Sequence, residues 1–301
     1  METEETAETD VADAADAADV ADIAEVAVVA DVDTTTGFHG KQLSQASVNT
    51  WTSRVKTLQS LGVDFNSYND IVGTIESQWS NINTRRNYLD AALRQLYLLK
   101  SDIELAKKIQ KVRDEYFDSY NSDRKKNVIT PKENENWVDW KEVVRVRDET
   151  EVLVEKVILG LYSYMPPRRI EDYNEMYWIS ENEEPVDNDV NYCLGYHSFV
   201  FNKYKTFGVY GQQEIPINKR LGELLKLWVK EKGIVSGGRL LGDVDIRKML
   251  YSVFGKNVGV GILRKSYITV INRAMLSEDT RETIGWMMGH SVDESRKYQK
   301  V

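Results

Sequence analysis

Apolar residues recur at intervals of three and four along the first third of the chain, which is the spacing of a buried helical face. Val48, Trp51 and Val55 begin this pattern just after Ser44 and Ser47, either of which can cap a helix. The spacing then repeats three times without a strong breaker, near residues 66–79, 83–99 and 103–116. Four short helices in succession predict a small helical domain.

Beyond residue 137 the pattern alternates between helical and extended spacing. A helical stretch covers about 149–164 and ends at Pro166-Pro167, because the residue before a proline is pushed out of the α region. Apolar and polar residues alternate from Tyr192 to Tyr204 and again from Val209 to Ile217. The turn Thr206-Phe207-Gly208 between them predicts a β-hairpin.

Helical spacing returns after the hairpin, in four stretches near 221–228, 246–254, 262–275 and 280–288. The chain therefore belongs to a mainly α (α+β) class, with an N-terminal helical domain and a mostly helical second domain that carries a small antiparallel sheet.

Composition divides the chain into four parts. Residues 1–36 repeat Ala, Asp and Val, and the apolar side chains among them are no larger than Ile23 and valine after the first residue, so we expect an acidic disordered tail. The helical domain covers 37–126, a polar linker 127–136, and the second domain 137–301.

The formal charge of −9 reflects the tail. Twelve of the 48 acids lie in residues 1–33, which hold no Lys or Arg, so the other 36 acids face all 39 bases and the rest carries about +3. A mildly basic body is compatible with a polyanionic partner. The acidic tail either competes with that partner for the basic body or is only a solvating tail, which is the commoner role of such segments.

Other features exclude several classes of protein. No apolar run approaches the roughly eighteen residues that cross a bilayer, and the acidic start lacks the basic residues of a signal peptide. Cys193 is the only cysteine, which excludes an internal disulfide and a cysteine-based zinc site. We therefore expect an intracellular protein without a membrane partner.

The end of the chain combines a Gly289-His290-Ser291 turn with a tyrosine, Tyr298, eight residues after the histidine. A terminal tyrosine by itself is most simply a packing residue at a helix edge. Four basic positions upstream and beside it change this interpretation, because each can contact a phosphate: Arg169, Lys205, Arg264 and His290.

In this order, these segments resemble the motifs of the tyrosine recombinase/integrase family. The family has an Arg followed by an apolar residue and an acid, then a hairpin Lys, a His-x-x-Arg helix, a Gly-His turn and a nucleophilic Tyr. The corresponding segments here are Arg169-Ile170-Glu171-Asp172, Tyr204-Lys205-Thr206, Leu263-Arg264-Lys265, Met288-Gly289-His290-Ser291 and Tyr298.

The resemblance covers roughly residues 40–301, and its Pro-Pro-Arg-Arg and Leu-Arg-Lys forms are most similar to a branch associated with large DNA viruses and mobile elements. It implies a core-binding domain at the N-terminus and location in a host nucleus or cytoplasm. It also implies a homo-tetramer on double-stranded DNA that works without metal or ATP.

The implied reaction is attack of the Tyr298 phenol on a phosphodiester. Arg169 and Arg264 would stabilise the charge that develops on the nonbridging oxygens, and His290 would donate a third hydrogen bond. Lys205 would protonate the leaving 5′-hydroxyl. A covalent 3′-phosphotyrosine would conserve the bond energy for rejoining.

Several points stay open in the sequence. Gly261 stands where the family often has His or Lys, and Arg168 could replace Arg169, although Ile170 keeps the apolar phase after Arg169. Lys203 could replace Lys205. The positions that we expect to contact DNA beside the catalytic ones are Arg85, Arg86, Arg94, Arg168, Lys203 and Lys265.

The function that this implies is site-specific recombination or integration. A type IB topoisomerase or telomere resolvase shares the same chemistry, and Gly261 also fits a relative that binds DNA without cleaving it. The target site and the choice between integration, excision and resolution are not written in these residues.

Overall fold

The computed structural model describes residues 45–99, 102–183, 189–274 and 276–300. The acidic tail expected at 1–36 lies outside these residues. The chain divides into two compact units, one ending at Asp123 and one beginning at Arg124, which we call unit 1 and unit 2.

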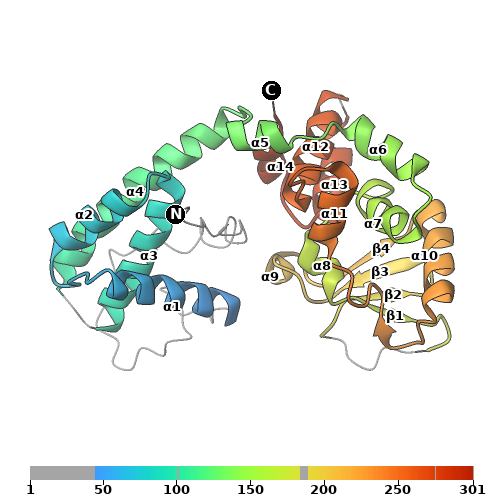
Figure 1. Ribbon diagram of the computed structural model, residues 1–301, viewed down its shortest axis with the longest axis horizontal. Helices are drawn as coiled ribbons and strands as arrows, with labels where there is room; N and C mark the ends of the chain where they lie inside the picture. The colour runs from blue at the N-terminus through green and yellow to red at the C-terminus, as the bar shows by residue number, and fades with distance from the viewer. Residues whose placement is uncertain (1–44, 100–101, 184–188, 275, 301) are drawn as a thin grey trace, which may run out of the picture. The chain divides into compact units, whose positions relative to one another are not determined.

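The described part of unit 1 consists of the expected helices, shown in blue to green in Figure 1: α1 (Gln45–Ser60), α2 (Tyr68–Gln78), α3 (Ile82–Leu98) and α4 (Ile103–Lys125). α1 and α2 both pack on α3. Leu58, Ile71, Ile75 and Leu89 are fully buried among them, which explains the spacing of three and four in the sequence.

α4 continues well past its expected end at residue 116, through a stretch with the composition of a linker. The next helix, α5 (Pro131–Asn136), lies inside the expected linker. Pro131 stands in its first turn, where its missing N–H costs nothing, and Thr130 and Glu133 form a capping box. Pro131 therefore starts a helix inside a segment whose composition predicts a linker.

Unit 2 combines a small sheet with the remaining helices. The helices are α6 (Trp140–Glu149), α7 (Leu153–Ser163), α8 (Ile170–Asn174), α9 (Phe207–Tyr210), α10 (Lys219–Lys232), α11 (Ile246–Phe254), α12 (Val260–Arg273), α13 (Glu278–Met287) and α14 (Val292–Tyr298). The mainly helical α+β class is confirmed.

The sheet has the strand order β4-β3-β2-β1-β5 in the described residues and mixes parallel with antiparallel pairs. Its strands are β1 (Tyr177–Ile179), β2 (Tyr192–Leu194), β3 (Ser198–Phe201), β4 (Gln213–Pro216) and β5 (Gly238–Arg239). The sequence predicts only one antiparallel hairpin over residues 192–217, whereas the sheet also includes β1 and β5, and β1 pairs parallel with β2.

The long strand expected at 192–204 is itself a hairpin of β2 and β3. Gly195 makes the turn with φ of +54°, a conformation that favours glycine. The connection from β3 to β4 contains α9 rather than a tight turn, but β3 and β4 do pair antiparallel.

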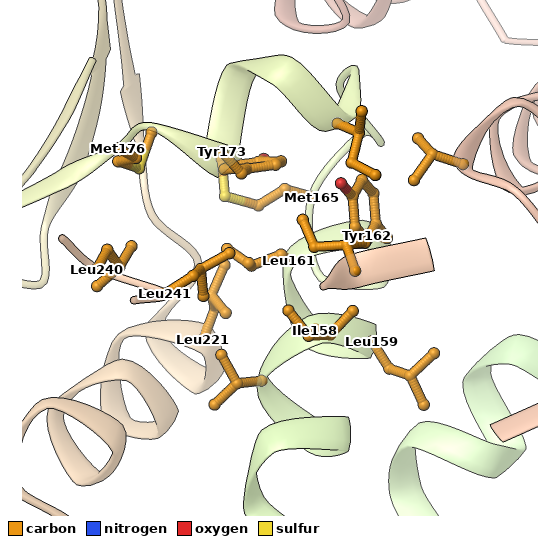
Figure 2. Close-up of a cluster of buried hydrophobic side chains, with 14 of the residues drawn as sticks. Ile158, Leu159, Leu161, Tyr162, Met165, Tyr173, Met176, Leu221, Leu240 and Leu241 are labelled. Atoms are coloured by element: carbon orange, nitrogen blue, oxygen red, sulfur yellow. The ribbon is translucent and has the colours of Figure 1, made fainter. Parts of the chain in front are cut away.

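The core of unit 2 surrounds α7, which packs against α6, α10 and α11. Figure 2 shows buried side chains from α7, α8, α10 and the loops between elements. They are Ile158, Leu159, Leu161, Tyr162, Met165, Tyr173, Met176, Leu221, Leu240 and Leu241. No helix in the described residues is both long and apolar enough to span a bilayer. This core fixes the segment 165–170, from which the candidate site begins.

Candidate active site

The C-terminal end of α13 is the organising feature of the site. The last carbonyls of a helix have no partner within the helix and carry its negative end. Here arginine and polar side chains from four other segments donate to them. The carbonyl of Trp286 accepts from Gln213, that of Met287 from Arg168, that of Met288 from Arg264, and that of Gly289 from Arg169 and Thr206.

Arg168 is the structural member of the Arg168-Arg169 pair. Its side chain is 1% exposed, its Nε lies 2.8 Å from Asp172 Oδ2, and its Nη1 donates to Gln213 Oε1 at 2.8 Å. The guanidinium also stacks 3.8 Å from the centroid of Phe201. Asp172, which follows Arg169 by three residues, pairs with Arg168 and not with Arg169.

Arg169 lies close enough to Arg264 and Tyr298 to interact with them electrostatically. It is half-buried, and its Nη1 lies 3.3 Å from the carbonyl oxygen of Gly289. Burial, and after it the charge of Arg264, lowers the pKa of Arg169, while the Tyr298 phenol opposes the shift. Of the two adjacent arginines, Arg169 is therefore the one that interacts electrostatically with both Arg264 and Tyr298.

Arg264 is held by backbone carbonyls rather than by acids. It is 3% exposed, and its Nη1 donates to Pro167 O at 2.7 Å and to Met288 O at 3.3 Å. Its Nε and Nη2 have no hydrogen-bond partner in the part of the chain that the structure describes. Buried donors of this kind need a partner, and a carbonyl leaves the positive charge uncompensated.

His290 follows a glycine turn instead of lying within a helix. Gly289 has φ of +66°, and a Cβ there would lie 3.3 Å from Arg168 Nη2 and from Thr206 Oγ1. Ser291 then caps α14 by accepting from Glu294 N. The bend that brings His290 back toward Tyr298 is thus the Gly289-His290-Ser291 turn that the sequence predicts, and α14 begins directly after it.

The imidazole of His290 is buried beside cations. Burial, followed by the charges of Arg264 and Arg169, lowers its pKa to about 3, so the ring is neutral at pH 7. Its Nδ1 lies 3.2 Å from Ser291 O and 3.3 Å from Ser295 Oγ, and its Nε2 has no partner among the described residues. Whether Nε2 carries a hydrogen depends on which of the two Nδ1 contacts prevails.

Tyr298 lies near both His290 and Arg264. Its ring centroid is 5.4 Å from that of His290 and 5.4 Å from the guanidinium carbon of Arg264. α14 packs against both α12 and α13, which carry or adjoin these partners. The structure therefore brings together four of the expected residues: Arg169, Arg264, His290 and Tyr298.

Lys205 is exposed in the connection between β3 and β4. Its neighbour Thr206 donates to Gly289 O at 2.8 Å, which ties this connection to the turn before His290. Gly261 is exposed on the first turn of α12, and a Cβ there would meet nothing within 4 Å.

The remaining basic candidates have partners within their own unit. Lys203 lies 3.4 Å from Glu175, and Lys265 forms an ion pair with Glu133 at 2.5 Å. In unit 1, Arg85 donates to the carbonyls of Trp79 and Glu76, and the buried Arg86 and Arg94 stack on aromatic rings. These contacts leave Arg86 and Arg94 little surface for a phosphate.

Sequence reasoning missed two parts of the site. Ser295 reaches His290, and Glu133 holds the segment around Tyr298 from the former linker. The S/T-x-x-E spacing of Thr130 and Glu133 was the available signal for the helix, but nothing in the sequence shows where that helix packs.

Comparisons with known proteins give few matches. No protein-family model matches the chain, and no curated protein does. A solved structure titled "Crystal structure of XerA recombinase" is similar over 86% of this chain and 88% of that one, with 12% identity and a TM-score of 0.40. A likeness of this degree carries no argument about activity, so the function must rest on the residues.

Proposed function

We propose that this protein is a tyrosine-type DNA strand transferase, a site-specific recombinase or integrase that acts on double-stranded DNA. The observation that carries the proposal is the position of the Tyr298 ring, 5.4 Å from both the His290 ring centroid and the Arg264 guanidinium carbon, in a partly buried cluster that also contains Arg169. Two arginines beside one another without a carboxylate between them favour an anion that both can bind.

In the proposed reaction the Tyr298 oxygen attacks a backbone phosphorus while the bond to the 5′-oxygen breaks. The phenol gives its proton to water, and the 5′-oxygen gains one from Lys205, the proposed acid. Arg169 and the unpartnered donors of Arg264 bind the nonbridging oxygens, on which charge develops. The product is a 3′-phosphotyrosine, and attack of a 5′-hydroxyl on it reverses the steps.

The histidine would contact the same phosphate through Nε2. A neutral imidazole with a hydrogen on Nε2 donates without adding a third positive charge to the two arginines. The low pKa of His290 fits this role. The proposal includes a homo-tetramer of the protein on DNA, which would hold together the two duplexes whose strands are exchanged.

The test is a covalent trap. The full chain is incubated with nicked duplexes, both a random-sequence library and fragments flanking its coding element, so that the released strand diffuses away. An adduct that survives denaturation and maps to Tyr298 is expected, and Tyr298→Phe should abolish it. Tyr251→Phe, at an exposed tyrosine of α11, is the matched control and should leave the adduct unchanged.

Two results would contradict the proposal in different ways. Wild-type protein that binds these duplexes without any adduct would be a binding protein only. Adducts that relax supercoiled DNA but never give Holliday junctions would make the protein a topoisomerase rather than a recombinase.

A further inference from the structure

A single carboxylate joins three segments that lie far apart in the sequence. Glu133 Oε1 accepts from Lys265 Nζ on α12 at 2.5 Å, and its Oε2 lies 3.1 Å from Lys300 Nζ at the end of the chain. The side chains of Glu133 and Lys300 are only 13% and 9% exposed. Since the pair is shielded from water, its geometry is much more restrictive than that of a surface ion pair.

Glu133 is charged throughout the physiological range. Burial alone would raise the pKa of its carboxyl, but hydrogen bonds from Lys265, the Thr130 N–H and Lys300 outweigh it and lower the pKa to about 2. Removing this charge would leave the buried ammonium group of Lys300 and the partly exposed one of Lys265 facing a neutral side chain, and breaking a shielded ion pair by removing one partner is costly.

The two lysines flank the residues of the proposed reaction. Lys265 directly follows Arg264, and Lys300 is two residues beyond Tyr298. The main chain at Lys300 is fixed as well, because its N–H donates to Thr269 Oγ1 at 2.9 Å, and Gln299 accepts from Asn272 at 3.2 Å. All these contacts place the end of α14 on α12.

A second ion pair fixes the start of the same helix. Arg124, in the last turn of α4, lies 3.0 Å from Glu294 in the first turn of α14. Burial would raise the pKa of Glu294, but Lys297 and Arg124 outweigh it and the pKa is lowered. The segment 124–133 therefore contacts α14 near both of its ends.

We infer that Glu133 is a positioning residue for Tyr298, and that the segment 124–133 acts as a strap that holds the nucleophile helix against the Arg264 helix. This inference rests on the proposed function for its kinetic part only. The strap itself is a property of the protein without DNA, and it can be measured without any reaction.

The experiment compares Glu133→Gln with Glu135→Gln in the full-length protein. Glu135 is exposed on the same short helix, so the control removes the same charge at nearly the same place. Hydrogen–deuterium exchange of residues 292–300 should be faster in Glu133→Gln and unchanged in Glu135→Gln. Lys300→Met, which removes the partner instead of the acid, should accelerate exchange in the same residues.

Adduct formation separates positioning from binding. At saturating nicked duplex, Glu133→Gln should form the adduct about ten- to a hundredfold more slowly, because small misplacements of a reacting group have effects of this size. Its dissociation constant for the same duplex should stay within about twofold of wild type, since the proposed role involves no DNA contact.

The outcomes are distinguishable. Unchanged exchange in both Glu133→Gln and Lys300→Met overturns the strap, and faster exchange with an unchanged adduct rate overturns the positioning role. If wild-type protein forms no adduct, the proposed function fails, while the exchange data still decide whether the strap exists. Melting curves of both variants identify loss of folding.

Discussion

The guanidinium carbon of Arg264 lies 5.4 Å from the centroid of the Tyr298 ring, although 33 residues separate them in the sequence. Two backbone carbonyls hold one nitrogen of this arginine and leave its other side for a ligand. Arg264 therefore has a fixed position, and its Nε and Nη2 donors remain available to a ligand. Transition-state stabilisation requires preorganised donors of this kind.

Arg264→Ala should accordingly affect rate far more than affinity. We expect single-turnover adduct formation at saturating DNA to fall by about 10²- to 10³-fold, as for loss of other preorganised donors. Arg273→Ala, at an exposed arginine at the end of the same helix, is the control for charge and should retain the rate. Near-normal cleavage by Arg264→Ala would remove the residue from the mechanism.

Ser295 should control which nitrogen of His290 carries the hydrogen. Its hydroxyl can donate to Nδ1, which leaves the hydrogen on Nε2, whereas the Ser291 carbonyl can only accept from Nδ1. Ser295→Ala should shift the ring toward the Nδ1–H form, visible in ¹⁵N chemical shifts of His290. It should slow adduct formation about tenfold or more, as loss of an orienting partner does at metal-bound histidines.

Ser291→Ala is the contrasting variant. It removes the α14 cap and should lower stability by about 1 kcal/mol, yet it keeps the backbone carbonyl near Nδ1. Identical histidine spectra for wild type and Ser295→Ala would rule out the tautomer role.

The two adjacent arginines should behave as opposites. Arg168→Ala leaves the buried Asp172 without its ion partner and should cost about 3–5 kcal/mol of unfolding free energy. Arg169→Ala should unfold at a similar urea concentration to wild type but fail to form the adduct. Urea titrations of both variants check this, and equal losses of stability would show that Arg169 is also structural.

Stability should fall on mild acidification because of His290. The pKa of its imidazole is about 3 in the folded protein against an ordinary value near 6.5, so below about pH 6.5 the unfolded chain binds a proton that the folded protein does not. The stabilisation that the neutral His290 contributes is fully present above about pH 6.5, and it decreases by about 1 kcal/mol per pH unit as the pH falls toward 3.

Urea unfolding between pH 7 and 5.5 measures the effect of His290 with little interference, because the lowered carboxyl pKa values of Glu133 and Glu294 act below about 4.5. His290→Asn should have a flatter profile in this range. If the unfolding free energy of His290→Asn depends on pH as steeply as that of the wild type, the titrating group is not His290.

The sequence predicted the helices well because each buries one face. Spacing of three and four along 48–58 and 246–254 follows the cores that the structure shows. It predicted the sheet less well, because alternation does not show where a strand turns, and the turn at Gly195 depends on a conformation that no pattern records.

The site was predictable in its residue types but not in its contacts. The phase of Ile170 favoured Arg169 over Arg168, and the structure places Arg169 beside Arg264 and Tyr298. The sequence predicts that the basic residues Arg86, Arg94 and Lys265 contact DNA, which requires their side chains to be exposed. Their aromatic and acidic partners are distant along the chain, so their burial could not be inferred.

The capping box of α5 gives Glu133 a second dependence. Its side chain accepts from the Thr130 N–H, a geometry that exists only while the six residues of α5 are helical. Unwinding of this single short helix would withdraw the acid from Lys265 and Lys300 together. The helix–coil equilibrium of residues 131–136 is thereby linked thermodynamically to the release of the end of the chain. Any ligand that favours the unwound state of these residues would also mobilise Tyr298.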